Sequence, residues 1–210
     1  MTKIQLWSEW IYRLSLLNIL WCVVAAAGLF VFGAAPAAAA VLRITRSWQQ
    51  GDELDGPIPL VFFRECKRWF FKANALFWIC LGAGVLLYWN ISFFLQWDTS
   101  ASPAVLGLSA AAVLLYTTLL LYSFPLYLVE ERGLFASIAC AFIYGVSFPL
   151  DTLALLLSAG ILFWLSTLTP VIHLFFTVSV MAFLTVAVVS KNARKVQFGP
   201  APAQQEKQAG

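Results

Sequence analysis

Residues 60–95 read LVFFRECKRWFFKANALFWICLGAGVLLYWNISFFL, and this stretch carries the pattern that decides the fold. In its first third, Arg64, Arg68 and Lys72 recur every four residues with Lys67 beside them. A helix would gather these four basic side chains along one side and leave apolar side chains largely on the other. The spacing therefore predicts a basic amphipathic helix in the membrane interface, over about 58–73.

Two roles are open to this basic helix. It either lies under anionic lipid head groups, which attract each nearby basic residue by about 1 kcal/mol, or docks a cytoplasmic or membrane partner. Its four basic residues are thus the candidate lipid-docking or partner-docking face. The following segment, 75–95, has no charged residue and is long enough to cross the hydrocarbon core of a bilayer.

The whole chain has the composition of a membrane protein. Of its 210 residues, 61% are hydrophobic, 16% aromatic and 11% charged, whereas a soluble domain carries about 25% charged residues. We expect residues 1–195 to form one membrane-embedded, all-α domain, a polytopic helical bundle of about five transmembrane helices plus two interfacial helices. Residues 196–210, rich in Pro, Ala, Gln and Gly, are expected to form a disordered cytoplasmic tail.

Prolines divide the later apolar sequence into spans. One alternative makes residues 134–157 a span. We favour the other, in which 134–148 is interfacial and Pro149 and Pro170 each stand where a new helix begins. The expected spans are then about 16–32, 75–95, 104–128, 150–168 and 171–190, with interfacial helices at about 58–73 and 134–148 and a short helix at about 37–48 leaving the bilayer along the interface.

The apolar stretch from Leu14 to Leu42 would be about 43 Å long as one helix, too long for one straight span and too short for two. Gly33 and Pro36 are the candidate helix break, because proline suits the first turn of a second helix. The small residues from Ala34 to Ala40 would support close helix packing, within one chain or between two copies, so a homo-oligomer is possible.

Charge predicts the orientation. Eleven of the thirteen Lys and Arg residues fall on one side of the expected bundle, and such residues mark the cytoplasmic side. We therefore expect a multi-pass protein of the bacterial cytoplasmic (inner) membrane with a cytoplasmic C-terminus. Five spans would leave Lys3 and Arg13 outside. In the alternative, the first segment is re-entrant, dips and returns at the Gly33–Pro36 break, and all thirteen basic residues lie inside.

Few polar side chains fall within the spans, and Asn18, Asn74, Asp151 and His173 are the candidate polar intramembrane residues. The two asparagines suit interhelical hydrogen bonds. Asp151 stands near the start of a helix, where it either complements the helix dipole or serves as a coupling carboxylate. His173, the only histidine, is either a hydrogen-bonded structural residue or a proton relay.

The sequence carries no pattern typical of an enzyme. It has neither an HExxH zinc motif nor a GxxxxGK[ST] phosphate loop, and no Ser/Lys or Cys/His pairing presents itself. The four cysteines are scattered without a CxxC pair. We expect no enzymatic activity, no cofactor and no metal site. The basic residues are placed as topology signals, so nucleic acid is not an expected partner.

Three segments resemble the YesL-like family of bacterial integral membrane proteins, namely Asn18–Trp21, Gly28–Ala37 and Phe62–Asn74. The resemblance extends over about residues 5–195, although residues 135–147 are more apolar than the family pattern leads one to expect. The family has no established function and no defined catalytic residues. Its genes tend to accompany carbohydrate-uptake systems of the ABC type, so the resemblance implies an accessory role in sugar import.

Two functions follow as hypotheses. The first is a membrane subunit associated with ABC-type carbohydrate uptake, which would have membrane lipids and an ABC sugar permease as partners. The second is a small-solute transporter or channel acting on its own, consistent with a faint duplication of layout between residues 16–95 and 104–168. The second hypothesis requires Asn74, Asp151 or His173 to line a cavity.

Overall fold

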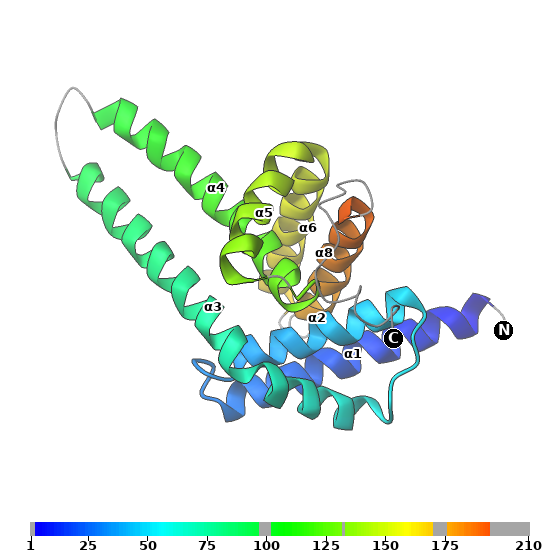
Figure 1. The fold of residues 1–210 in the computed structure, drawn as a ribbon. Helices are drawn as coiled ribbons and strands as arrows, with labels where there is room; N and C mark the ends of the chain where they lie inside the picture. The colour runs from blue at the N-terminus through cyan, green and yellow to red at the C-terminus, as the bar shows by residue number, and fades with distance from the viewer. Residues whose placement is uncertain (1–2, 97–101, 132, 170–175, 194–210) are drawn as a thin grey trace, which may run out of the picture.

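The computed structural model describes residues 3–96, 102–131, 133–169 and 176–193, and these residues form helices joined by turns. The prediction of an all-α helical bundle is confirmed. Figure 1 shows the helices in chain order: α1 (Lys3–Ala27), α2 (Ala34–Gln50), α3 (Ile58–Leu95), α4 (Ser102–Leu128), α5 (Leu134–Ser147), α6 (Pro149–Leu168) and α8 (Thr177–Ala193).

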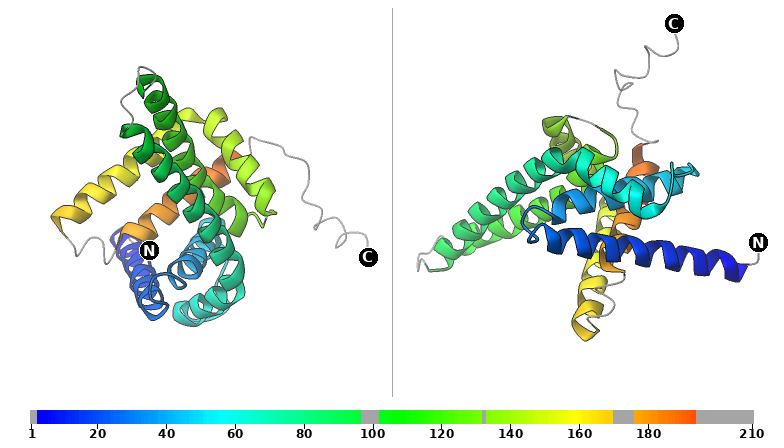
Figure 2. Two further views of the ribbon diagram at one scale, coloured as in Figure 1. Left: turned by 90° about the vertical axis from the view of Figure 1, so that its left-hand side faces the viewer. Right: turned by 90° about the horizontal axis from the view of Figure 1, so that it is seen from below.

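The helices α1 and α2 form an antiparallel hairpin and lie side by side in each view (Figures 1 and 2). Near the turn, the Trp21 indole nitrogen donates a hydrogen bond to the carbonyl oxygen of Ala34 at 3.2 Å. At the open end, the Arg13 guanidinium lies 5.4 Å from the centre of the Trp48 ring. The hairpin therefore brings Arg13 to the same end as the basic residues of α2, as in the re-entrant alternative.

The hairpin turn, residues 28–33, is apolar, its residues 29–32 are exposed, and its backbone is bonded internally. The amides of Gly28, Leu29, Phe30 and Phe32 donate to carbonyl oxygens at residues 24, 26, 25 and 28, at 2.6–3.1 Å. Leu29 and Phe30 adopt positive φ angles of 53° and 59°, and the Leu29 side chain is 80% exposed. Internal bonding lets an irregular turn occupy an apolar environment that offers no water to its amides.

Two glycines permit this tight turn. A Cβ atom added to Gly28 would lie 2.4 Å from the Cα of Gly33, and one added to Gly33 would lie 2.3 Å from the carbonyl oxygen of Val24. Pro36 lies in the first turn of α2 and is buried. The helical break expected at Gly33 and Pro36 is thus a turn that begins earlier, at residue 28, because α1 ends at Ala27.

Helix α3 is continuous from Ile58 to Leu95, so the expected boundary between segments 58–73 and 75–95 falls inside one helix. Its buried side chains end at Leu76. Figure 1 shows α3 bending away from the α1–α2 hairpin and running beside α4 as an antiparallel arm. The Tyr116 hydroxyl of α4 donates to the carbonyl oxygen of Cys80 in α3 at 2.8 Å. The arm therefore has side-chain contacts along its length while its outer faces stay exposed.

The helices α5, α6 and α8 pack beside the C-terminal half of α4. In this second core, the Tyr122 and Tyr144 rings of α4 and α5 lie 5.8 Å apart. The Tyr122 hydroxyl is 3.1 Å from the Thr152 hydroxyl of α6. The first core lies between α2 and the start of α3, where Val41, Phe62 and neighbouring small residues are fully or almost fully buried.

Four described helical segments are long and apolar enough to cross a membrane, by length and composition: Ser8–Ala27, Ile58–Leu95, Ala104–Leu128 and Pro149–Leu168. The fifth expected span, 171–190, begins in residues outside the described part, and its described helix, α8, has 17 residues. Helix α5 ends at Ser147 and α6 begins at Pro149, so the expected bounds of 134–148 and 150–168 lie within one residue of these helices. The expected tail, 196–210, lies outside the described residues.

Replacing Gly33 by alanine is expected to lower the free energy of unfolding by about 2 kcal/mol, because the added methyl group would overlap the Val24 carbonyl oxygen. Gly107→Ala is the matched control, since an added Cβ there meets no atom within 4 Å and alanine favours a helix. Denaturant titration in detergent micelles measures both variants. Equal stability of the two would contradict the close packing of the turn.

Candidate functional site

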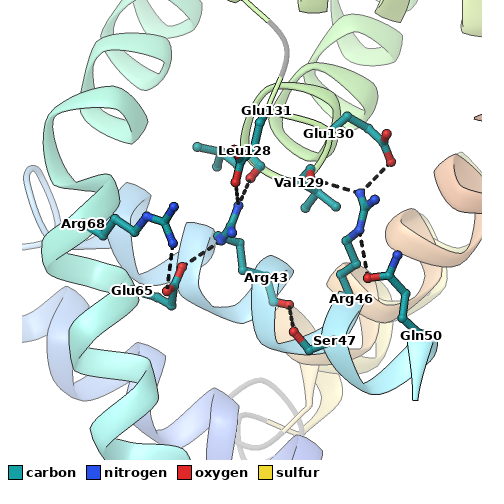
Figure 3. A network of polar contacts seen from close by, with 10 residues as sticks. All are labelled: Arg43, Arg46, Ser47, Gln50, Glu65, Arg68, Leu128, Val129, Glu130 and Glu131. Atoms are coloured by element: carbon teal, nitrogen blue, oxygen red, sulfur yellow. Dashed lines mark hydrogen bonds and ion pairs between the residues drawn. The ribbon is translucent and has the colours of Figure 1, made fainter. Parts of the chain in front are cut away.

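The C-terminal end of α4 is held by two arginines of α2 (Figure 3). Arg43 Nη1 donates to the carbonyl oxygen of Leu128 at 2.8 Å, and Arg46 Nη1 donates to that of Val129 at 3.0 Å. The last carbonyl groups of a helix have no partner within the helix, and a cation there also opposes the negative end of the helix dipole. The two arginines therefore cap α4 from another helix.

Acidic residues complete this network on both sides. The carboxylates of Glu131 and Glu130, which follow α4, pair with Arg43 at 2.9 Å and with Arg46 at 2.6 Å. Glu65 of α3, whose side chain is 13% exposed, pairs with the Arg43 Nε at 2.7 Å. Arg43 therefore joins α2, α3 and the end of α4 through a single guanidinium group, with the planar fork geometry that suits carboxylates.

The Trp69 ring of α3 contacts two cations, Arg43 of the network and Lys72. The guanidinium carbon of Arg43 and the Nζ of Lys72 each lie 4.8 Å from the centre of its ring. A cation over an aromatic face is favourable by about 0.5–1 kcal/mol at exposed sites. The buried indole therefore holds Arg43 and Lys72 on one flank of α3.

A polar pocket of about 310 Å³ adjoins the network. Its charged lining is mixed and comprises Arg43, Arg46, Asp52, Glu53, Asp55, Arg64 and Glu65. Arg43 and Arg46 are committed to the α4 cap, and Arg64 lies 3.9 Å from Asp55. The described lining carries three arginines and four acidic residues, so the pocket offers a nearly neutral polar recess and not a site for a strongly charged ligand.

The structure divides the four predicted basic residues into two groups, all of them exposed. Arg64, Arg68 and Lys72 lie on the flank of α3 that faces the arginine network, where Arg68 approaches Glu65 at 3.8 Å. Lys67 lies on the other flank and lines an apolar groove beside the hairpin turn. A common side of the helix, expected from the spacing, is therefore two distinct surfaces in the fold.

Asn18 of α1 caps another helix and is fully buried. Its side-chain oxygen accepts hydrogen bonds from the amides of Val178 and Ser179, at 3.0 and 3.1 Å, in the first turn of α8. An asparagine oxygen at a helix N-terminus satisfies amides that otherwise lack a partner. Asn18 thus serves as an acceptor between helices and is committed to the backbone.

Asn74 and Asp151 also have partners in other elements. The Asn74 amide donates to the carbonyl oxygen of Phe32 in the hairpin turn at 3.2 Å and to that of Phe70 at 2.9 Å. Asp151 lies in the first turn of α6 and pairs with Lys191 of α8 at 3.0 Å. These two residues tie α3 to the turn and α6 to α8. His173 lies outside the described residues.

From the sequence, Arg43 and Arg46 count only among the basic residues that indicate the cytoplasmic side, and Glu130 and Glu131 carry no predicted role. Their signal was nevertheless present, since Arg43 and Arg46 stand three apart on a short helix and two acidic residues follow a long apolar one. Nothing in the sequence paired these two features. Among the described residues, no group of three His, Cys, Asp or Glu side chains could hold a metal ion.

Long apolar helices, exposed apolar faces and few charged groups within the apolar segments define a multi-pass helical membrane protein. A family described as "Protein of unknown function, DUF624" matches residues 14–91. YesV of Bacillus subtilis (strain 168) is 32% identical over 77% of this chain and 77% of its own length. YesL of the same organism is 31% identical over 72% and 69%.

A third relative in that organism, YteU, is 29% identical over 90% of this chain and 84% of its own length. All three relatives are described as uncharacterized proteins. The chain belongs to this YesL-like family of unknown function, as the sequence resemblance indicated. No solved structure matches the chain.

The substitution Arg43→Gln is expected to lower the free energy of unfolding by about 2 kcal/mol, because the mostly buried Glu65 keeps only the 3.8 Å contact with Arg68 and the Leu128 carbonyl loses its arginine donor. Arg64→Gln is the control, because Arg64 is half exposed, its partner Asp55 is almost fully exposed, and such a pair contributes less than about 1 kcal/mol. Unfolding titrations in micelles compare the two variants. Similar losses would show that Arg43 is not a central contact.

The substitution Asn18→Leu is expected to lower the free energy of unfolding by about 0.5–2 kcal/mol, the usual range for loss of a helix N-cap, because two amides of α8 would lose their acceptor. Asn90→Leu is the control, since Asn90 is exposed and accepts only a 3.5 Å contact from Ser109 among the described residues. Hydrogen exchange at the start of α8 should rise in the Asn18 variant alone. Unchanged exchange would contradict the capping role.

Proposed function

We propose that the protein is a membrane subunit without catalytic activity that associates with a partner membrane protein through the basic flank of α3. The flank is defined as Arg64, Arg68 and Lys72. The proposal rests on one observation, namely that the polar side chains predicted within the membrane are bonded to other parts of the chain. Asn18 and Asn74 bond to backbone groups, and Asp151 pairs with Lys191. These contacts support a scaffold more than a solute path, which needs polar groups free to face a solute.

The exposed surface also favours association. In the apolar windows of the candidate spans, only 11% of the residues of α4 and of α6 are buried within the chain, and 22% of those of α1. Lipid tails can cover such apolar faces as well as a partner helix can, so these faces alone do not select a partner. The basic flank can select a partner, because exposed charges steer its encounter with an acidic surface and set the register of the complex.

The proposed partner is a permease subunit of an ABC-type carbohydrate importer. This choice comes from the family resemblance, in which the genes of members accompany such systems. The proposed location is the bacterial cytoplasmic membrane with the basic end of the molecule inside. If the α1–α2 hairpin is re-entrant and α3, α4, α6 and α8 each cross, both termini are cytoplasmic, which leaves no basic residue outside.

The test is co-purification of the tagged protein in mild detergent from native membranes of cells grown on plant polysaccharide, with partners identified by mass spectrometry. We expect permease subunits in stoichiometric amount. The variant R64Q/R68Q/K72Q should retain about tenfold less partner, since each rim charge contributes to the encounter, while its level in the membrane stays normal.

A matched control removes the same charge from the end of the chain, in R194Q/K195Q/K207Q, and should keep the partner. Equal losses in both triple variants would point to net charge and count against a specific flank. A pure monomer or homo-oligomer from wild-type membranes would overturn the proposal. Sugar flux into liposomes containing only this chain, abolished by Asp151→Asn, would establish the transporter alternative instead.

A further inference from the structure

An apolar groove of about 560 Å³ lies between the α1–α2 hairpin and α3, on the flank opposite the arginine network. Gly28 and Pro36 form part of its hairpin wall, and Phe63 and Phe70 part of its α3 wall. Among the described residues of this lining, Lys67 is the one basic residue and none is acidic. The groove thus combines an apolar surface with a single positive charge.

The location of the groove fits the boundary between head groups and lipid tails. The adjoining hairpin turn exposes four apolar side chains in a row, at residues 29–32, and has its amides bonded internally. These features suit the hydrocarbon region. Lys67 lies on the part of α3 that carries the other exposed basic residues, and a lysine near a membrane boundary extends its charge toward the head groups.

The charge of Lys67 is available to a ligand. Every other basic residue of α3 has a protein contact, since Arg64 and Arg68 approach acids and Lys72 lies over Trp69. Within the described part of the chain, Lys67 has neither an ion pair nor an aromatic face. A groove with one uncompensated cation is complementary to an apolar ligand that carries an anionic group.

The polarity of the groove favours a lipid over a partner helix. Apart from Lys67, the described lining residues are apolar. In a bilayer an apolar helix face gains no hydrophobic driving force over lipid tails. A lipid tail can follow the groove between the hairpin and α3.

We propose that this groove binds one anionic phospholipid, with an acyl chain along Phe63 and Phe70 and the phosphate accepting a hydrogen bond from Lys67 Nζ. The site is separate from the flank used in the proposed function. A lipid in this position would fill the space between the hairpin turn and α3 and so hold the two elements together. A ligand that binds only the native state stabilises it by RT ln(1 + [L]/Kd), so the stabilisation grows with the logarithm of the affinity.

The experiment uses the full-length protein in nanodiscs of equal phosphatidylglycerol and phosphatidylcholine, followed by native mass spectrometry of the lipids it retains. The wild type should retain phosphatidylglycerol in preference. Lys67→Gln should lower the ratio of phosphatidylglycerol to phosphatidylcholine about fivefold. Lys72→Gln removes the same charge from the same helix outside the groove and should leave the ratio nearly unchanged.

A second pair of variants tests the apolar part. Ala27 is exposed and lines the groove, and Ala26 is its exposed neighbour outside the lining. Ala27→Trp should displace the retained lipid, and Ala26→Trp should not. Equal retention of the two lipids by the wild type, equal effects of the two lysine variants, or undiminished lipid in Ala27→Trp would each overturn the proposal. None of these outcomes bears on partner capture by the Arg64, Arg68 and Lys72 flank.

Discussion

The fold depends on the contact between two arginines of α2 and the carbonyl end of α4. A helix that ends against protein has carbonyl groups that water cannot reach freely, and leaving them unpaired is costly. Arg43 and Arg46 satisfy the carbonyls of Leu128 and Val129 and are themselves neutralised by Glu65, Glu130 and Glu131. Since Arg43 also pairs with α3, the same contact fixes the α1–α2 hairpin against the start of the α3–α4 arm.

The same constraint explains the polar residues elsewhere in the apolar helices. Most backbone amides of the hairpin turn donate to carbonyl oxygens within the hairpin, and the Asn74 side chain donates to the Phe32 carbonyl. Asn18 supplies an acceptor to the first amides of α8. In a low-dielectric environment an unpaired backbone group costs more than in water. Asn18 and Asn74 therefore serve backbone groups within the apolar helices, which is why we infer a scaffold.

Helix α3 takes part in both the internal packing and the two proposed binding surfaces, because its two flanks differ. One flank carries Arg64, Arg68 and Lys72 beside the arginine network, and the other carries Lys67 above an apolar groove. The buried line through Phe62, Cys66 and Trp69 separates them. Under the two proposals, α3 contacts a protein partner through one flank and an anionic lipid through the other.

The sequence by itself determined the class of fold and much of the helix pattern. Apolar run length requires membrane-spanning helices, and proline at residue 149 separates α5 from α6 because it cannot donate the next helical hydrogen bond. Spacing also marked the basic residues of α3, since periodicity is a local property. Only the tertiary structure decided that the α1–α2 hairpin forms a groove with the Lys67 side of α3, that Asn18 caps α8, and that Arg43 reaches Leu128. These pairings join residues distant in the chain, and local spacing carries no information about which distant carbonyl or carboxylate a side chain will meet.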